Sequence, residues 1–236
     1  MLAAEQGSAE IGAHAHHAIQ ITFLLEGAYE VSALGESFTG PIVAVDSDTP
    51  HMFRARGGAA AFLFVEPESA AGCALAQQLF SHRPVAQFTS PEALSALEAL
   101  RKCFRDGGAE ADILKLGREI VPALPTSVSP ALPDPRVVRM IGYAAGKLED
   151  KLTLPAAAAH INLSQGRARH LFAAHTGLPF KTYVLWLRLE RAVQLYAGGH
   201  SLTEAAHHAG FADSAHFSRT FRRTFGLPAA ALRLEN

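Results

Sequence analysis

Hydrophobic residues follow two different patterns along the chain. Up to about residue 66, short β-prone runs alternate with turns that contain glycine; the runs are 19–23, 29–32, 42–45 and 61–65, and the turns contain Gly27, Gly35, Gly40 and Gly57. Many short strands separated by glycine turns are typical of a small β-barrel or jelly roll. We therefore expect a β-barrel over residues 1–66.

From residue 67 the apolar residues recur at helical spacing. Segments rich in alanine and leucine at 74–80, 91–104 and 113–120 predict two or three helices within 67–122. One of them carries an apolar stripe that can pack on its own domain or mediate dimerisation, formed by Leu94, Leu97, Leu100 and Phe104. The prolines that follow predict an interdomain linker over 123–135.

The remaining residues, 136–236, repeat one helical unit. The pattern Phe-x-x-x-x-Gly-Leu-Pro at 172–179 recurs at 221–228, and a self-match at a fixed offset indicates a duplicated structure. Each copy is preceded by an apolar helical face, a turn residue and a helix cap: Asn162 and Ser164 in the first copy, Gly210 and Asp213 in the second. This order predicts two helix-turn-helix units, each ending in a short helix that suits the DNA major groove.

The stretch between the two units predicts one amphipathic connecting helix from Phe180 to about Leu195. At 1.5 Å per residue such a helix is roughly 25 Å long. Together with the width of the units, this length can separate the two recognition helices by about one turn of DNA, ~34 Å. The expected fold class is therefore α+β, with an N-terminal barrel flanked by helices and a C-terminal all-α domain.

The charge is unevenly distributed along the chain. The formal net charge is −1, but residues 134–236 hold 13 Lys and Arg against 7 Asp and Glu, whereas residues 1–133 hold 8 against 15. The C-terminal part is therefore +6 and the N-terminal part −7. A basic module favours a phosphate backbone, whereas an acidic one is suited to sensing a ligand or contacting a partner.

Residues 134–233 resemble the DNA-binding domain of the AraC/XylS family of bacterial transcription regulators. The resemblance is carried, in order, by Leu154, Ala158, Ser164, Leu171, Phe172, Gly177, Arg188, Leu189, Ala192, Ala206, Gly210, Phe211, Asp213, His216, Phe217, Arg219, Phe221 and Gly226. It implies a sequence-specific regulator of transcription, not an enzyme, in which a ligand in the N-terminal domain changes how promoter DNA is engaged. Double-stranded DNA, RNA polymerase and a second copy of the chain are the expected macromolecular partners.

The exposed side chains of the two recognition helices are the expected DNA contacts. For base edges we expect Gln165, Arg167 and Arg169 from the first unit and Ser214, Ala215, Ser218 and Arg219 from the second. Gly166 lowers the helix propensity of the first recognition helix. For phosphates, which position the protein without specifying sequence, we expect Arg188, Arg222 and Arg223.

The strand region resembles a metal-binding cupin in two motifs. His14-x-His16-x-x-x-Gln20 and the later His51 match the cupin pattern of two histidines, a glutamate and a further histidine, with Gln20 in place of the glutamate. This resemblance implies a Zn, Ni or Fe ion on His14, His16, Gln20 and His51, since alternate residues of a strand face the same way. Metal affinity is then expected to fall as the pH drops through about 6.5.

Three other roles are open for this region. His14, His16 and His17 can be an exposed polar stretch, with His51 a satisfied barrel residue. If the metal site forms instead, alternation places His17 on the opposite strand face, away from the metal. The barrel can instead hold an organic effector, for which Arg54 and Arg56 are candidate anion contacts, with placement on the surface as the alternative. A metal-dependent cupin enzyme with an appended DNA-binding domain is the alternative function, although no adjacent acid–base pair is found and the usual carboxylate ligand is replaced.

Composition limits the remaining classes. No run reaches the 18 or so apolar residues of a membrane span, and no secretion signal opens the chain. Cys73 and Cys103 lack the spacing of a redox or zinc motif, so we expect two reduced thiols in a cytoplasmic protein, with a redox switch as the alternative.

Overall fold

The computed structural model describes residues 2–4, 10–123 and 132–229, and all statements below concern these residues. The chain forms two compact units with a boundary between Ala131 and Leu132, and Thr224–Gly226 are grouped with the first unit. Nine strands and the helices α1–α3 precede the boundary, and the helices α4–α9 follow it. The linker expected over 123–135 therefore lies largely outside the described residues, and α4 begins at its last residue, Pro135.

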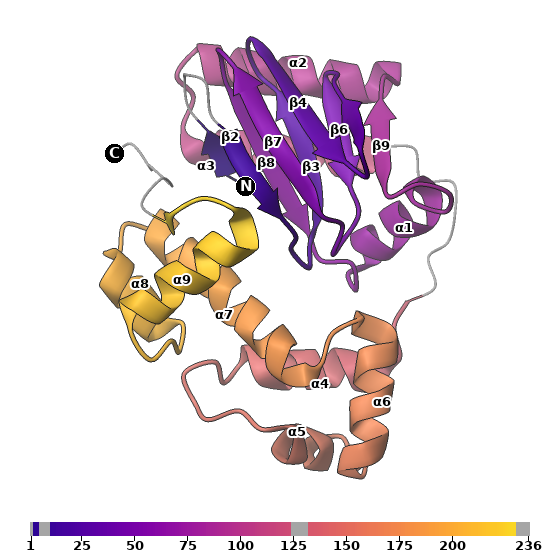
Figure 1. Ribbon diagram of the computed structural model, residues 1–236, viewed down its shortest axis with the longest axis vertical. Coiled ribbons are helices and arrows are strands. Elements are labelled where there is room, and N and C mark those ends of the chain that lie inside the picture. Colours follow the sequence, from indigo (N-terminus) through magenta and orange to yellow (C-terminus); the bar gives the residue numbers. More distant parts are fainter. Residues whose placement is uncertain (1, 5–9, 124–131, 230–236) are drawn as a thin grey trace. The chain divides into compact units, whose positions relative to one another are not determined.

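The strands of the first unit form two antiparallel sheets (Figure 1). The five-stranded sheet has the order β1 (Leu2–Ala4), β8 (Ala60–Val65), β3 (Ile19–Leu24), β6 (Ile42–Val45) and β9 (Val85–Phe88). The four-stranded sheet has the order β2 (Glu10–His14), β7 (His51–Arg56), β4 (Ala28–Ala33) and β5 (Glu36–Phe38). The α+β fold class is confirmed, and the strands of the β-domain are divided between two sheets.

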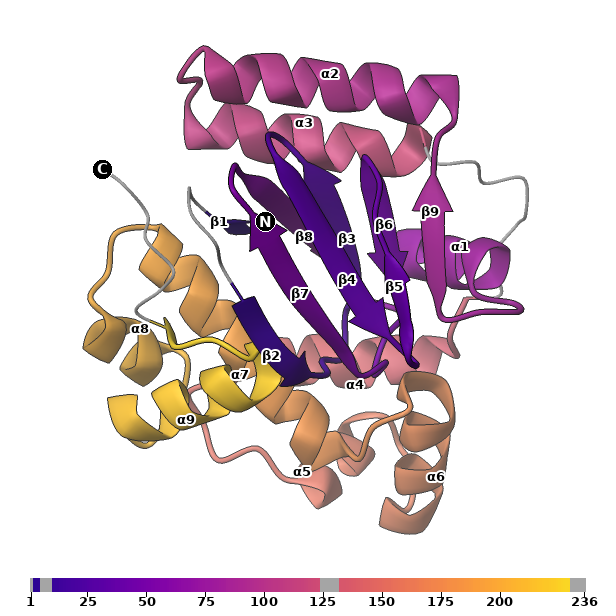
Figure 2. The same ribbon diagram turned by 45° about the horizontal axis from the view of Figure 1, so that its top comes forward.

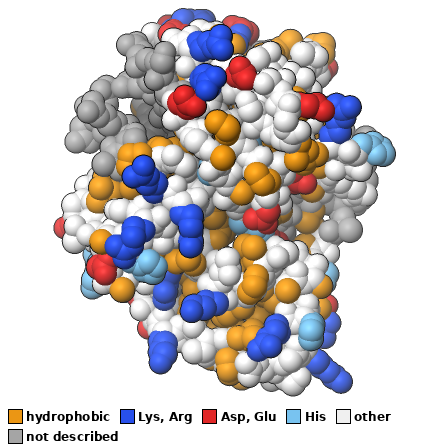
Figure 3. All heavy atoms as spheres, viewed as in Figure 1, with side chains coloured by type: hydrophobic (Ala, Val, Ile, Leu, Met, Phe, Trp, Pro, Cys, Tyr) orange, Lys and Arg blue, Asp and Glu red, His pale blue; other side chains and the backbone are white. Residues whose placement is uncertain are grey.

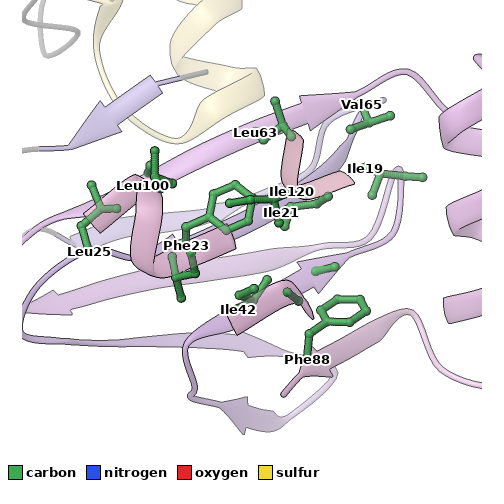
Figure 4. Packing of buried hydrophobic residues seen from close by; sticks show 14 of the residues in the cluster. Ile19, Ile21, Phe23, Leu25, Ile42, Leu63, Val65, Phe88, Leu100 and Ile120 are labelled. Carbon is green, nitrogen blue, oxygen red and sulfur yellow. The ribbon is translucent and has the colours of Figure 1, made fainter. Parts of the chain in front are cut away.

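Side-chain alternation along the five-stranded sheet produces two apolar cores. On one face, Ile19, Ile21 and Phe23 of β3 pack with helical residues in the cluster drawn in Figure 4. On the other face, Val43 and Val45 of β6 pack with side chains of the four-stranded sheet, including Tyr29, Val31 and Phe53. Since both faces are covered, β3 and β6 are buried almost throughout, and β6 is a continuous hydrophobic run.

Three helices accompany the sheets: α1 (Ala70–Leu79), α2 (Pro91–Arg105) and α3 (Glu110–Ala123). Helix α2 starts where the sequence predicts, because the Ser90 hydroxyl accepts a hydrogen bond from the Ala93 amide and Pro91 fits the first turn. Its residues Leu97 and Leu100 are fully buried in the core beside the five-stranded sheet, and α2 and α3 lie side by side (Figure 2). A dimer interface on α2 would therefore have to use other residues.

The helical extension expected over 67–122 also contains a strand. Val85–Phe88 forms β9 and pairs with β6 at the edge of the five-stranded sheet, with Val85 opposite Val45 and Phe88 opposite Ile42. Only Val85 and Phe88 of its four residues are buried. Such a short edge strand gives a weak pattern, and its position in the sheet depends on contacts that are remote in sequence.

The second unit contains the two expected helix-turn-helix pairs. The first pair is α5 (Leu154–His160) and α6 (Gln165–Thr176), and the second is α8 (Leu202–His208) and α9 (Ser214–Phe225), with α4 (Pro135–Ala145) before them. The expected caps are confirmed, since Ser164 accepts from the Arg167 amide and Asp213 from the His216 amide. Asn162 and Gly210 both adopt positive φ angles, 56° and 82°, in the turns.

The connecting helix α7 extends from Phe180 to Ala197, and its 18 residues are about 27 Å long. Tyr183, Val184 and Leu187 pack into the core of the first helix-turn-helix pair. The buried positions Leu189 and Ala192 follow further along α7, beside which α8 packs. One helix therefore contributes to the packing of both pairs.

Gly166 gives a test of how far local propensity limits the first recognition helix. It lies in the first turn of α6, and a Cβ atom built on it has no neighbour within 4 Å. We expect Gly166→Ala to raise the free energy of unfolding of the second unit, by up to about 1 kcal/mol. Gly142→Ala in α4, at another open helical position, is the matched comparison.

Urea unfolding followed by fluorescence of Trp186 measures this change, because the single tryptophan is buried in α7. The prediction fails if Gly166→Ala is less stable than the wild type while Gly142→Ala is more stable. That result would show that Gly166 is needed for a reason other than helix propensity.

Candidate functional site

Four polar side chains that the sequence singles out meet at one end of the space between the two sheets. His14 ends β2, His51 begins β7, and the two are opposite each other in the strand register. Gln20 lies in β3, where alternation directs it away from the helical core that contains Ile19 and Ile21. His16 lies in the connection between β2 and β3. The expectation that His14 and His16 share one strand is therefore wrong, although both reach the same place.

The histidines are close enough to share a ligand. One nitrogen from each of His14, His16 and His51 lies within 4.8 Å of those of the other two, and among the described residues this is the group of histidine, cysteine and acidic side chains that could hold a metal ion. The Gln20 Oε1 atom lies 3.1 Å from Nε2 of His16 and 3.3 Å from Nε2 of His51. We call these four residues the histidine cluster.

Hydrogen bonds to the main chain orient all three imidazoles. Nδ1 of His14, His16 and His51 lies 2.8, 2.9 and 2.8 Å from the carbonyl oxygens of Gly12, Ala18 and Thr49. A carbonyl oxygen only accepts, so each Nδ1 carries the proton and each neutral ring has its lone pair on Nε2. This arrangement is the one that metal-binding histidines use, in which the second nitrogen is held by a hydrogen bond.

Burial keeps the cluster neutral. His16 and His51 are 3% and 2% exposed. Desolvation by burial lowers the pKa of His16 to about 4 and that of His51 to about 3, and it also lowers the pKa of His14. Protons therefore compete with a metal ion for these nitrogens only at a pH lower than 6.5, the pKa of an unperturbed histidine. The expectation that metal affinity falls through pH 6.5 is corrected accordingly.

The donor set fits a divalent transition metal. Three imidazole nitrogens suit zinc, nickel and iron, and an amide oxygen or water can complete the shell. Gln20 Nε2 donates to the Thr22 hydroxyl at 3.2 Å, which turns Oε1 toward the histidines. Because the Thr22 hydroxyl can accept from the Gln20 NH2 group or donate to the Gln20 oxygen, it can orient the amide in either direction. The Gln20 oxygen can then face the histidines when a cation is bound, and the NH2 group can face them when it is not.

His17 has a different role from the one that alternation suggests. Its ring is buried, with Nε2 2.5 Å from Glu68 Oε1 and Nδ1 3.5 Å from Asp48 Oδ2. Burial alone would lower the pKa of His17, but the two carboxylates raise it to about 9. The Glu68 side chain is only 4% exposed, and its Oε2 has no hydrogen-bond partner among the described residues. His17 is therefore the cation that balances a buried carboxylate.

The two arginines considered for an anionic effector lie on the outside of the four-stranded sheet. In β7, His51, Phe53 and Ala55 are buried, whereas Arg54 and Arg56 alternate with them and are exposed. Arg54 forms an ion pair with Glu10 across β2 and β7 at 3.0 Å. Of the two placements considered for these arginines, an anion site inside the β-domain and the protein surface, the structure shows the surface, because strand alternation turns them outward.

The two cysteines are free thiols in the structure and both are half-buried. Cys73 donates a hydrogen bond to the Pro67 carbonyl at 3.2 Å. Burial raises the pKa of the Cys73 thiol, with a further increase from the Glu68 carboxylate. A thiol with a raised pKa is a poor nucleophile near neutral pH.

The first recognition helix exposes the polar residues that the sequence singles out. Gln165, Arg167 and Arg169 of α6 are all exposed, whereas Ala168 and Phe172 are buried in the core of the pair. The structure therefore leaves the expected base-contacting side chains accessible. Arg136, Arg167 and His170 also surround a shallow depression over Leu163 and Leu171.

The second recognition helix shows the same division. Ala215, Arg219, Arg222 and Arg223 of α9 are exposed and Ser214 and Ser218 are half-buried, whereas Phe217 and Phe221 are fully buried. Figure 3 shows Lys and Arg side chains gathered over α7–α9 with few acidic ones among them. These residues remain predictions as DNA contacts, and their exposure is what the prediction requires.

Arg188 differs from the other expected phosphate contacts. It is half-buried in α7, where its Nε and Nη2 donate to the carbonyl oxygens of Leu148 and Asp150, each at 3.0 Å. Burial lowers the pKa of its guanidinium. Two of its nitrogens thus bind the main chain of the connection between α4 and α5, which no sequence pattern indicated.

The buried ionisable groups of the first unit predict how its stability depends on pH without metal. The pKa of His17 lies above the unfolded value of 6.5, so its contribution is complete below pH 6.5 and is lost as the pH rises through about 9. The pKa values of His16 and His51 lie below 6.5, so their contributions are complete above pH 6.5 and are lost as the pH falls toward 4 and 3. Stability should therefore be greatest near pH 6.5.

His17→Ala isolates the alkaline part of this dependence. It leaves Glu68 buried without its cation, so at pH 6.5 the free energy of unfolding should fall by about 3 kcal/mol. The loss of stability between pH 6.5 and 9 should also disappear. Both changes are measured by urea unfolding in the presence of a chelator. Pulse proteolysis, read out on peptides of the first unit, gives the unfolded fraction at each urea concentration. Exposed His82→Ala is the control, and an unchanged alkaline dependence in His17→Ala would contradict the assignment.

Similarity to known proteins is strongest in the second unit. A family model described as a helix-turn-helix domain matches residues 157–235. The transcriptional regulator YpdC of Escherichia coli (strain K12) is 39% identical over 77 residues, which cover 32% of this chain and 27% of YpdC. The regulator GbdR of Pseudomonas aeruginosa (strain UCBPP-PA14) is 32% identical over 95 residues, which cover 40% of this chain and 26% of GbdR. The chain thus matches about a quarter of the length of these two relatives.

Two similarities extend over both units. The transcriptional activator RhaS of Pectobacterium carotovorum subsp. carotovorum (strain PC1) is 30% identical over 214 residues, which cover 78% of this chain and 66% of RhaS. The crystal structure of ToxT from Vibrio cholerae O395 has a TM-score of 0.63 at 10% identity and covers 98% of this chain and 96% of ToxT. ToxT shows the fold alone. Within the described part of the chain, no helix is long and apolar enough to span a membrane.

Proposed function

We propose that this chain, which belongs to the AraC/XylS family of transcription regulators, is a sequence-specific DNA-binding regulator controlled by a ligand in its first unit. One observation carries the DNA-binding part. Two capped helices, α6 and α9, each bury one face in a helix-turn-helix core and expose arginine and other polar side chains on the surface that the core leaves free. This is the arrangement by which such helices enter the major groove.

We further propose that the effector is a divalent transition metal on the histidine cluster. Nitrogens of the three histidines and the Gln20 oxygen lie close together in a buried space, and the lowered pKa values keep the imidazoles neutral. When bound, the metal would supply a charge that links β2, β3 and β7. His14, His16 and His51 would hold it, and the carbonyls of Gly12, Ala18 and Thr49 would keep the rings oriented.

Control of DNA binding requires the effector to bind one state of the protein more tightly than another. A ligand on the histidine cluster can favour one arrangement of the first unit over another, because His14, His16 and His51 come from β2, from the connection after it and from β7. In the proposed function the protein works in the cytoplasm with promoter DNA, and RNA polymerase and a second copy of the chain are further partners to be tested.

A metal-dependent cupin enzyme is the second candidate, favoured only by the same three histidines. The histidine cluster contains no carboxylate for acid–base chemistry, since His14, His16 and His51 are joined by the amide of Gln20. Oxidation or hydrolysis of a small substrate by the iron-loaded protein would support the enzyme. Metal-dependent DNA binding without turnover would support the regulator.

The DNA interface can be tested with a single substitution. If both recognition helices bind, a footprint should show two short protected boxes about 10 base pairs apart on one face of the duplex, with affinity that falls steeply as salt rises. Arg219→Ala should cost about 1 to 3 kcal/mol at one base pair of the second box and leave the first box unchanged.

Arg223→Ala is the matched control for Arg219, because both arginines are exposed on α9. As a phosphate contact, Arg223 should affect all sequences equally and reduce the salt dependence. Binding titrations against single-base variants of the site distinguish the two patterns. A footprint over one groove only would reject binding by both units.

The metal proposal predicts stoichiometric binding that depends on His16. Protein without a histidine tag, loaded with Zn or Ni, should hold about one equivalent, and His16→Ala should lower the affinity by at least about 100-fold. The exposed His82→Ala should bind as the wild type does. Gln20→Glu should bind more tightly, because a carboxylate is a stronger ligand than an amide.

The pH dependence gives a second criterion. Because burial lowers the pKa of His16 to about 4 and of His51 to about 3, zinc affinity measured by calorimetry should change little between pH 7.5 and 5.5. A steep loss around pH 6.5 would show that exposed histidines bind the metal. No metal in the wild type after loading would leave an organic effector in its place.

A further inference from the structure

Three segments of the second unit meet around Arg188: the connection between α4 and α5, the connecting helix α7, and the turn between α8 and α9. The Arg188 side chain leaves the connecting helix α7 and binds the carbonyl oxygens of Leu148 and Asp150, which belong to the connection between α4 and α5. This connection leads into the first helix-turn-helix pair, whose core also contains Leu148. Arg188 therefore joins the connecting helix to the main chain that leads into the first pair.

The turn of the second pair packs against the same place. Gly210, in the turn between α8 and α9, has φ +82°, and a Cβ atom built on it would lie 2.0 Å from the Leu148 oxygen and 2.9 Å from Arg188 Nε. No side chain can occupy that space without moving the main chain of residue 148. The absence of a side chain at Gly210 thus allows the second turn to touch the carbonyl that Arg188 binds.

These contacts connect the two helix-turn-helix pairs within the protein itself, independently of DNA. The oxygen of Leu148 is shared by the first pair, the connecting helix and the second turn. Moving the connection between α4 and α5 away from α7 would break both hydrogen bonds of the half-buried Arg188. The second pair is held at the same place by the close approach of Gly210 to the Leu148 oxygen and to Arg188. The arrangement resists changes in the distance and angle between α6 and α9.

We propose that Arg188 is a positioning residue that sets the spacing of the two recognition helices, and through it the spacing between the two DNA boxes that the protein accepts. The inference rests on the proposed binding of DNA by both pairs. It replaces the expected phosphate contact by a contact within the protein.

The test uses full-length protein and a duplex that the wild type selects from a random library. One set of derivatives changes the distance between the two boxes by one to three base pairs, and another scrambles one box. Wild type should prefer the selected spacing by about ten-fold or more. Arg188→Gln and Arg188→Lys should both lose most of this preference and bind the one-box duplexes within about two-fold of wild type.

Arg188→Lys separates positioning from charge. Lysine keeps the positive charge but does not offer the planar pair of donors that reaches both carbonyls. If Arg188 contacts a phosphate, Arg188→Lys should instead restore binding, and Arg188→Gln should weaken all duplexes alike and lower the salt slope by about 0.9. That result would overturn the proposal. Arg191→Gln, an exposed change on the same helix, controls for the loss of one charge.

Gly210→Ala tests the same contact from the opposite side and applies even if the Arg188 variants fold poorly. Its control is Gly199→Ala, since Gly199 also has a positive φ, 92°, but has no atom within 4 Å of a built Cβ. Trp186 fluorescence verifies that each variant is folded. Gly210→Ala should change the preferred spacing and Gly199→Ala should not.

The failures can be told apart. Unchanged spacing preference in folded Arg188→Gln and Gly210→Ala variants would overturn the positioning role and leave DNA binding by both pairs intact. Selection of a one-box duplex by the wild type would overturn both proposals.

Discussion

A β-strand directs successive side chains to opposite faces, and the first unit depends on this constraint at its five-stranded sheet. Strand β3 sends Ile19, Ile21 and Phe23 into the core with the helices, so Gln20 and Thr22 must enter the space between the sheets. A shift of register by one residue would exchange the two sets. The polar end of that space and the apolar core on the other face are therefore fixed by the same alternation.

The sequence predicts the second unit more completely than the first. Its signals are local: Ser164 and Asp213 cap helices a few residues away, and Asn162 and Gly210 provide the left-handed turns. In the first unit the short strands β2, β5 and β9 have little pattern of their own, because their place is decided by partners far along the chain. His17 illustrates the same limit, since its partner Glu68 is 51 residues away.

The histidine cluster could be named from the sequence, but its physical basis could not. The spacing of His14, His16 and Gln20 suggests two ligands on one strand, whereas His16 reaches the cluster from the connection after β2. The carbonyls that orient the rings each lie two residues from the histidine that they bind. Such short-range bonds depend on backbone angles in the connections, which residue types do not specify.

Arg188 recognises main-chain atoms of Leu148 and Asp150, not their side chains. A contact of this kind places few demands on which amino acids form the connection between α4 and α5, as long as its backbone follows the same path. Related chains can therefore vary freely in composition there, whereas insertions or deletions are poorly tolerated. The connection should diverge in sequence during evolution while its length stays constant.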